Sequence, residues 1–230
     1  MRVIKCLIVF FILAGVAFAQ NTDEKKKVYR ATVDRESIHG LIDIAIKTYE
    51  SIESYQVTLK TSNNNVTEKI KYYFKKPGSI RIEFIKPHKG AILVYNPSKK
   101  VARLMPFGFL RYFVLTLSPG NRLIKSSKGH GVDESDIGAL LKMVKRLQSH
   151  GKSIKLKDET VGKRQTVLIR VEGEGDFNVD GIHMYLLWLD KITLMPLKVS
   201  AYNTQGKLIE EVSMDDLQIN IEFPEDLFDL

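Results

Sequence analysis

The sequence predicts an α+β domain in which helices pack against an antiparallel sheet that curls around apolar contents. Two segments repeat apolar residues at steps of three and four, the period of an amphipathic helix. Between and after them, apolar and polar residues alternate over short stretches that end in turn residues. Such alternation is typical of antiparallel strands with one buried face. The resulting order of helix, strands, helix, strands indicates the α+β class.

The first helix is predicted over residues 36–53, with Asp34 as its N-cap. Its apolar residues recur on one face and are Ile38, Leu41, Ile42, Ala45, Tyr49 and Ile52. A helix with a single apolar face buries that face against another layer, which here is the sheet.

A meander of short strands is predicted after this helix. Apolar and polar residues alternate within Tyr55–Leu59, Ile70–Phe74 and Ile80–Phe84, and two shorter strands follow at Ala91–Tyr95 and Val101–Leu104. Turn residues separate several of these strands at Asn63–Asn65, Pro77–Gly78 and Asn96–Ser98. Residues 104–117 are apolar and aromatic without a clean period.

A second helix is predicted over residues 133–148, with Asp133 or Ser135 as its cap. Its apolar face consists of Ile137, Leu140, Leu141, Val144 and Leu147. The strands predicted after it are 153–158, 164–171, 182–190, 195–203 and 206–214. The strand at 182–190 is apolar on both faces, and the last two strands form a hairpin.

The N-terminal segment reads as a secretory signal. Arg2 and Lys5 form a short positive region, an apolar run follows, and Ala17–Ala19 matches a small-x-small cleavage site. We therefore expect residues 1–19 to be a signal peptide cleaved after Ala19, with an uncleaved N-terminal anchor as the alternative. Residues 20–34 are then a flexible leader and residues 35–230 a single domain of a periplasmic protein. The only cysteine, Cys6, lies in the signal, so a packed core rather than a disulfide must stabilise the domain.

Motifs for catalysis, cofactors and metals were not found in the sequence. There is no G-x-S-x-G turn, and the histidines do not have the spacing of a metal-binding helix. Glu210 and Glu211 are adjacent in a predicted strand, so they face opposite ways and form a poor acid/base pair. We expect a non-enzymatic protein without cofactor or metal, and an enzyme assembled from residues distant in sequence is the less favoured alternative.

The net charge of +8 is spread over mixed surface charges. It favours solubility and a weak, transient attraction to anionic membranes. A nucleic-acid partner is not expected, because an exported chain without a recognition motif gives no reason for one.

Two segments carry a resemblance to a known family. Residues 73–84 (YFKKPGSIRIEF) have an aromatic pair, a basic pair, Pro and then an apolar strand, and Ala91–Asn96 continues this pattern. Near the C-terminus, a strand ending in Asp190-Lys191 precedes the segment Leu194–Val199, then a turn at Gly206 and a final Asn-to-Phe stretch. In this order the segments resemble the LolA-like periplasmic lipoprotein carriers, and most closely an uncharacterised exported branch of that superfamily.

The resemblance implies an open, strongly curved antiparallel sheet, a half-barrel, with helices covering its concave apolar face. In such carriers the concave interior holds acyl chains. On this interpretation the residues expected to line the cavity are Ile70, Tyr72, Phe74, Ile82, Phe84, Phe109, Phe113 and Trp188. Trp188 is expected to face inward, although its strand is apolar on both sides, and an entering acyl chain would then change its fluorescence.

Two departures from the carrier pattern concern the lid and the C-terminus. Lys76 stands where the carrier has an arginine that latches the lid, and lysine lacks the forked donor geometry of arginine. The latch is therefore expected to be weaker or absent. The carrier also continues past its last strand, whereas this sequence ends at Leu230, so handover to a receptor lipoprotein is expected to be missing.

The function predicted from these patterns is a soluble periplasmic carrier that binds lipid or lipoprotein in outer-membrane lipoprotein sorting or envelope lipid transport. Its partners would be acyl chains, with an inner-membrane transporter or an outer-membrane receptor as further partners. The alternative is a non-enzymatic envelope sensor or interaction module on the same fold. In that case the helices fill the interior, because apolar alternation alone does not distinguish a filled core from a cavity.

Overall fold

The computed structural model describes residues 38–63, 66–108, 112–125 and 131–230. Within them, eleven strands form one sheet: β1 (Ser54–Asn63), β2 (Val66–Lys75), β3 (Ser79–Lys86), β4 (Ile92–Asn96), β5 (Val101–Met105), β6 (Leu115–Leu117), β7 (Gly151–Val161), β8 (Arg164–Gly173), β9 (Met184–Asp190), β10 (Pro196–Tyr202) and β11 (Leu208–Ile219). The helices are α2 (Ile38–Glu50) and α3 (Ile137–Ser149), with short 3-10 turns η1 (Val132–Glu134) and η2 (Glu225–Phe228).

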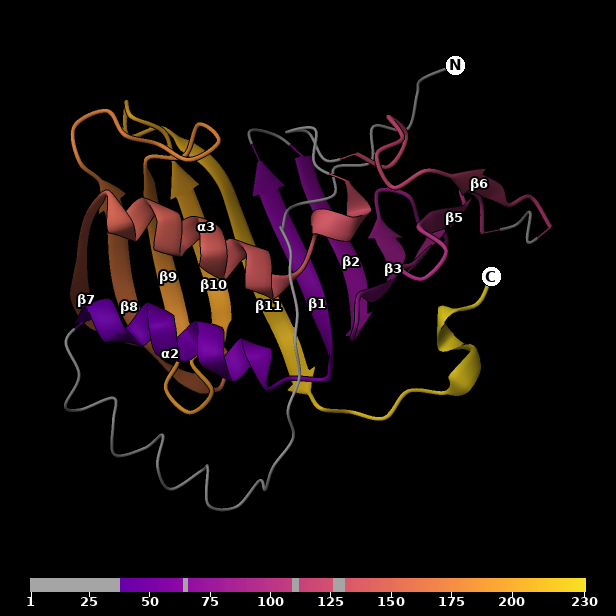
Figure 1. The fold of residues 1–230 in the computed structure, drawn as a ribbon, viewed down its shortest axis with the longest axis horizontal. Helices are drawn as coiled ribbons and strands as arrows, with labels where there is room; N and C mark the ends of the chain where they lie inside the picture. The colour runs from indigo at the N-terminus through magenta and orange to yellow at the C-terminus, as the bar shows by residue number, and fades with distance from the viewer. Residues whose placement is uncertain (1–37, 64–65, 109–111, 126–130) are drawn as a thin grey trace.

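The sheet is built from two antiparallel meanders that meet at one strand pair. Its order is β6-β5-β4-β3-β2-β1-β11-β10-β9-β8-β7, so β1 and β11 join the N-terminal and C-terminal halves. Strands β6 and β7 are consecutive in the chain but lie at opposite edges of the sheet. The connection between them must therefore cross the whole sheet, and α3 is part of this crossing (Figure 1).

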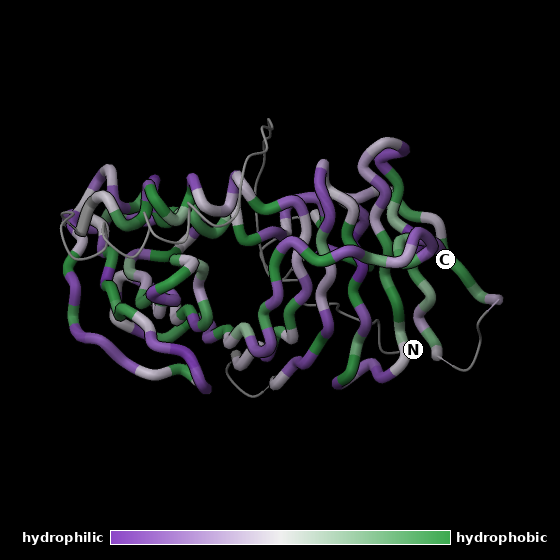
Figure 2. The backbone as a smooth tube through the Cα atoms, turned by 90° about the horizontal axis from the view of Figure 1, so that it is seen from below, coloured by the Kyte–Doolittle hydropathy of each residue, from purple (hydrophilic) through white to green (hydrophobic). Residues whose placement is uncertain are grey.

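Both helices lie on the same side of the sheet. They cover the half formed by β7 to β11, and the sheet curves beneath them (Figures 1 and 2). Helix α3 contacts β7 and β8, and α2 contacts α3 and β7. The predicted α+β fold with an open, curved antiparallel sheet is confirmed.

The predicted apolar faces are the ones that pack in the core. All five apolar residues expected on the second helix are buried in α3, and alternate residues of β1, β2 and β3 are buried with them. The predicted cap of this helix was wrong. Asp136 is the N-cap, and its carboxylate accepts a hydrogen bond from the Ala139 amide at 3.0 Å. Asp133 lies instead in η1, and Ser135 is the C-cap of η1, so the helix starts later than either candidate predicted.

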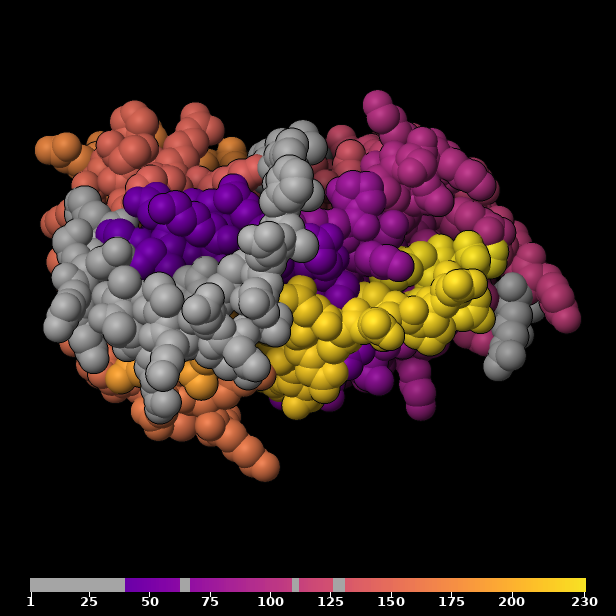
Figure 3. Space-filling model, turned by 60° about the horizontal axis from the view of Figure 1, so that its bottom comes forward, coloured from indigo at the N-terminus to yellow at the C-terminus, as the bar shows by residue number. Residues whose placement is uncertain are grey.

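The C-terminal segment packs on the outer face of the sheet (Figure 3, yellow), where η2 contacts β3 and β4. Arg81 donates from Nη1 to the carbonyl oxygen of Leu227 at 3.0 Å. The Phe223 ring meets Tyr73 at 6.0 Å and Phe228 at 5.6 Å between centroids. This strap packs on part of the convex side, the face opposite the one that the helices cover.

Candidate functional site

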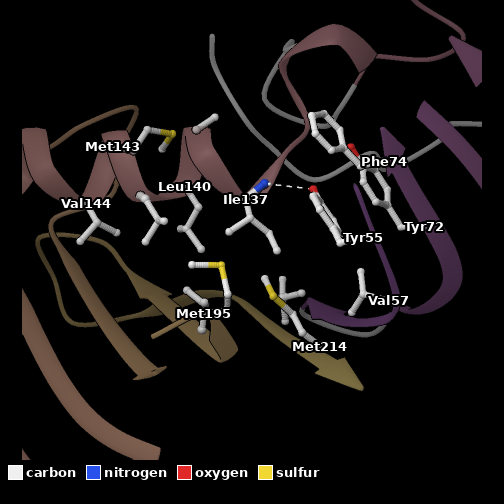
Figure 4. Packing of buried hydrophobic residues seen from close by; sticks show 14 of the residues in the cluster. Tyr55, Val57, Tyr72, Phe74, Ile137, Leu140, Met143, Val144, Met195 and Met214 are labelled. Carbon is white, nitrogen blue, oxygen red and sulfur yellow. Dashed lines mark hydrogen bonds between the residues drawn. The ribbon is translucent and has the colours of Figure 1, made fainter. Parts of the chain in front are cut away.

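An apolar cavity lies between α3 and the concave face of the sheet. Its walls come from α3, β1, β2, β9, β10 and β11, and they include Val57, Tyr72, Leu140, Val199 and Met214. Figure 4 shows Ile137 and Leu140 of α3 opposite Val57 and Met214 of the sheet. Its volume is about 40 Å³, counted as the space that the centres of water-sized spheres can reach. That is room for roughly three such spheres, so the cavity is smaller than an extended acyl chain.

Methionine makes part of this wall adaptable. Met214 lines the cavity, and Met195 and Met143 lie in the same buried cluster around it (Figure 4). A methionine side chain is unbranched and flexible, so it can repack around a guest at small cost.

A stack of aromatic rings fixes the first turn of α3 to the sheet. The Tyr55 ring lies 5.9 Å from the Tyr72 ring and 5.1 Å from the Phe74 ring, and both pairs are stacked. Its phenolic oxygen accepts a hydrogen bond from the Ile137 amide at 3.3 Å, the dashed line in Figure 4. Burial raises the pKa of Tyr55 well above its ordinary value, so the phenol stays neutral.

Two further polar contacts hold the same turn. The hydroxyl groups of Tyr72 and Ser135 lie 3.3 Å apart, and Ser135 also donates to the Val132 carbonyl at 2.6 Å. Tyr49 of α2 hydrogen-bonds the carboxyl group of Asp136, and burial raises the pKa of that carboxyl group. These contacts make the N-terminus of α3 the anchored end of the helix that roofs the cavity.

The Gly138→Ala variant is expected to loosen this anchor. A Cβ at Gly138 would lie 2.2 Å from Cε1 of Tyr49, so the Tyr49 ring would have to move. We expect a loss of about 1–3 kcal/mol in the free energy of unfolding, which exceeds the gain of up to about 1 kcal/mol from better helix propensity. Urea denaturation of this variant and of Gly120→Ala measures the effect. A Cβ at Gly120 would meet only the Lys125 side chain at 3.5 Å, so equal losses in the two variants would contradict the packing argument.

The cavity has an acidic end. Glu210 of β11 lines it, and Glu68 of β2 shares the concave face with Tyr72 and is only 5% exposed. Burial, and then the nearby charge of Glu210, raise the pKa of Glu68 from 4.5 to about 7. The prediction that Glu210 and Glu211 face opposite ways is confirmed, because Glu211 instead accepts from Ser200 and pairs with Lys198.

Lys76 ties the end of β2 to the end of α2. Its ammonium group donates to the carbonyl oxygen of Glu50, the last residue of α2, at 2.6 Å, and lies 3.5 Å from the Glu53 carboxylate. A cation at a helix C-terminus is favourable, because the last carbonyl groups lack partners within the helix. Lys76 therefore holds a helix at the concave face, and whether it acts as a lid latch stays a prediction.

Most of the predicted lining residues are buried on the concave face but lie beside the cavity rather than in its wall. Ile70, Phe74, Ile82 and Phe84 belong to the buried core, and of the predicted set only Tyr72 lines the cavity. Phe84 instead meets the ring of His88 at 6.3 Å. Whether any of these residues touches a ligand stays a prediction.

Of the two phenylalanines predicted from the aperiodic segment, the structure describes Phe113, and Phe113 does not line the cavity. Phe113 is 48% exposed and meets Phe107 at 6.3 Å in the connection between β5 and β6. Phe109 lies outside the described residues. The apolar character of 104–117 therefore includes exposed aromatic surface, which alternation could not have indicated because the segment has no period.

The expected inward direction of Trp188 was wrong. Its neighbours Leu187 and Leu189 enter the core cluster, so alternation places Trp188 on the opposite face of β9. There its indole nitrogen donates to Glu159, and the ammonium group of Lys198 lies 4.8 Å from the ring centroid. An apolar guest in the cavity would not touch this tryptophan, so its fluorescence is a poor reporter of binding.

Several cavity residues were not predicted as site residues. The alternation of apolar and polar residues in β1 could have predicted that Tyr55 and Val57 face the concave side. Val199, Ala201 and Met214 belong to the C-terminal hairpin, and their place in the wall depends on the pairing of β11 with β1. That pairing joins segments far apart in sequence, which local periodicity does not predict.

Among the described residues, no cluster of three or more His, Cys, Asp or Glu side chains could hold a metal ion. Nor does any helix in that part of the chain have the length and apolar character needed to cross a membrane.

A family model described as "Protein of unknown function (DUF1571)" matches residues 39–230. A search of curated proteins found no match. The chain is similar to MucB in its complex with MucA(peri), with a TM-score of 0.54 and 15% identity over 84% of this chain and 60% of that one. The lipoprotein LppX of Mycobacterium tuberculosis gives a TM-score of 0.51 at 8% identity, over 81% and 97% of the two chains.

A LolA superfamily protein of Nitrosomonas europaea also matches, with a TM-score of 0.38 and 12% identity over 84% of this chain and 97% of that one. The similarities to MucB and LppX, at 15% and 8% identity, are similarities of the fold. This chain spans 60% of the MucB chain that it matches.

Proposed function

The chain belongs to the DUF1571 family of proteins of unknown function, and from its cavity we propose that it is a non-enzymatic protein that binds an acyl chain. The observation that carries the proposal is the apolar cavity that α3 and the concave sheet enclose around Leu140 and Met214. Burying apolar chain in such a site contributes about 0.8 kcal/mol per CH₂ group. Contact with eight carbons would contribute on the order of 6 kcal/mol before the costs of ordering and of moving α3.

The signal-like segment at residues 1–19 supports a periplasmic location, with cleavage after Ala19. It lies outside the described residues. In the periplasm the ligand would be the acyl chains of a lipid or a lipoprotein. A role in lipoprotein sorting or envelope lipid transport would then require a membrane transporter or receptor as donor or acceptor.

Exposed aromatic residues support a transient contact with the membrane surface. Phe107, Tyr112 and Phe113 lie in the connection between β5 and β6 and all have large exposed surfaces. Aromatic rings partition favourably into the headgroup region of a bilayer, and the basic net charge adds attraction to anionic lipids. Such a contact would bring the protein close to a source of acyl chains.

The second candidate function is an interaction module with a filled interior. The small size of the cavity favours it, because about 40 Å³ holds no long chain without rearrangement. MucB, whose fold is similar to that of this chain, was crystallised in complex with a protein partner, MucA(peri). In this reading the fold presents a surface to a protein partner, and the cavity is a packing defect.

The Ala201→Leu variant separates the two functions. Ala201 lines the cavity, so a leucine there fills existing space. We expect it to weaken binding of decanol at least tenfold while the free energy of unfolding falls little, because no overpacking results. Isothermal titration calorimetry measures the affinity, and urea denaturation measures the stability.

Ala102→Leu is the matched control. Ala102 is fully buried in the core of the other half of the sheet, away from the cavity. Overpacking there should cost about 1–3 kcal/mol of stability and leave the decanol affinity unchanged. Failure of the unmodified protein to bind decanol, or equal affinities for unmodified protein and Ala201→Leu, would favour the interaction module.

A further inference from the structure

The positive charge of the chain is concentrated in one stretch of sequence. Residues 84–132 hold nine of the 35 lysine and arginine residues and none of the 27 aspartate and glutamate residues. The rest of the chain is left with 26 basic and 27 acidic residues and is close to neutral. The charge is therefore not evenly mixed over the chain. This stretch contains β4, β5 and β6, which form the edge of the sheet remote from α2 (Figure 1).

Two connections meet at one end of this edge. Gly90 lies between β3 and β4, and Gly108 lies between β5 and β6. A Cβ atom at Gly90 would lie 3.0 Å from Cα of Gly108, so the two backbones are in contact. Ile92 at the start of β4 pairs with Met105 at the end of β5, which places both connections at the same end of their strands.

The joined connections carry exposed aromatic rings and exposed cations. We call this group the aromatic-basic tip, and its members are Phe107, Tyr112, Phe113, Lys86 and Lys89. The rings of Phe107 and Phe113 lie 6.3 Å apart between centroids, and Tyr112 is fully exposed. Both lysines are exposed, and neither forms an ion pair with a described residue. The tip therefore combines apolar surface with positive charge.

The acids closest in sequence or pairing do not neutralise the tip. Glu83 on β3 is engaged by Arg81, whose Nε lies 2.8 Å from its carboxylate. Asp133 lies near Tyr95, at the other end of β4. Glu68 is buried on the concave side of the sheet. An anionic partner would therefore meet the lysines of the tip without competition from these carboxylates.

We propose that the aromatic-basic tip docks the protein on an anionic phospholipid membrane, with the rings in the headgroup region and the two lysines against lipid phosphates. Aromatic rings are favourable at this depth of a bilayer, and basic residues are attracted to anionic lipids. The two effects add when they act on one surface. The inference rests on the membrane contact of the proposed function and adds the lipid class and the residues. It does not depend on whether the cavity binds acyl chains.

The test is co-sedimentation with vesicles of phosphatidylcholine alone and with vesicles that contain about one third phosphatidylglycerol. The protein is purified after export, because an uncleaved apolar segment at residues 1–19 could itself enter bilayers. At about 0.05 M salt we expect at least about tenfold tighter binding to the anionic vesicles, and at about 0.5 M salt most of this preference should disappear. Equal binding to both kinds of vesicle would overturn the proposal. Binding to neither would also overturn it and would favour an acidic protein partner.

Charge reversal locates the contact on the molecule. The double variant Lys86→Glu, Lys89→Glu should weaken binding to the anionic vesicles at least about tenfold. The double variant Lys163→Glu, Lys207→Glu is the matched control. It has the same net charge, and its substitutions lie at exposed positions between β7 and β8 and between β10 and β11. Equal losses in the two double variants would mean that the contact is not made by the tip.

The apolar part of the tip is tested separately. Phe113→Ser should weaken binding to the anionic vesicles at least about fivefold, because less apolar surface enters the interface. Ile192→Ser is the control, since Ile192 is 67% exposed in the connection between β9 and β10 and should leave binding unchanged. Equal binding by Phe113→Ser and the unmodified protein would overturn ring insertion. Urea denaturation should show unchanged stability for all of these exposed substitutions.

Vesicle binding and decanol binding separate the two proposals. The tip variants should bind decanol as the unmodified protein does, because the tip does not line the cavity. An unmodified protein that binds decanol but not anionic vesicles would refute membrane docking alone. One that binds anionic vesicles through the tip but not decanol would refute acyl binding alone.

Discussion

The Tyr55→Ala variant is expected to lose at least about 3 kcal/mol of unfolding free energy, which is typical of a truncated buried aromatic residue. Tyr55 is almost fully buried and stacks on Tyr72 and Phe74, so truncation leaves a void between the sheet and α3. The Ile137 amide also loses its acceptor. Urea denaturation should show a lower midpoint with an unchanged slope.

Two controls divide this loss into its parts. Tyr55→Phe keeps the ring and removes only the hydroxyl, so it should cost about 1 kcal/mol, the usual net worth of one hydrogen bond. Tyr112→Ala removes a fully exposed tyrosine and should leave stability unchanged. A loss below 1 kcal/mol for Tyr55→Ala would mean that the aromatic stack does not hold α3 in place.

The Glu68→Gln variant is expected to be more stable than the unmodified protein above pH 7, and the difference should vanish at low pH. The pKa of Glu68 is about 7 in the folded state and near 4.5 when exposed. Because the folded state holds this proton more tightly, the contribution of Glu68 to stability falls as the pH rises from about 4.5 to about 7. The shift corresponds to about 3 kcal/mol over that window.

Glutamine cannot ionise, so the variant should lose this part of the pH dependence. The measurement is the difference in unfolding free energy between variant and unmodified protein at pH 4.5, 6 and 8. Taking the difference cancels other groups, such as Asp133 and Asp136, whose pKa values are also raised by burial. A difference that is constant across the three pH values would mean that Glu68 is not a buried acid in the folded protein.

The fold was predictable wherever one face of a segment is clearly apolar. Alternation in Ile80–Phe84 and the helical period from Ile137 to Leu147 each predicted the buried face that the structure has. The cap of α3 was not predictable, because Asp133, Ser135 and Asp136 are all capping residues within four positions. Asp136 is the N-cap because the 3-10 turn Val132–Glu134 and its C-cap Ser135 take up the residues before it.

The site was less predictable than the fold, because it depends on contacts between distant segments. In β9, Leu187 and Trp188 are both apolar, so the sequence of that strand does not say which one faces inward. The answer depends on Glu159 of β7 and Lys198 of β10, which supply partners on the outer face. The acidic end likewise requires β1 to bring β2 and β11 together, which neither strand indicates by itself.

The most direct test of acyl binding is a crystal structure of the protein with 10-bromodecanol, in which anomalous scattering locates the bromine. The proposed function predicts a bromine peak between α3 and the sheet, near Leu140 and Met214, with α3 displaced outward relative to the ligand-free structure. A bromine peak only outside this cavity, with Leu140 and Met214 in their present contacts, would contradict it.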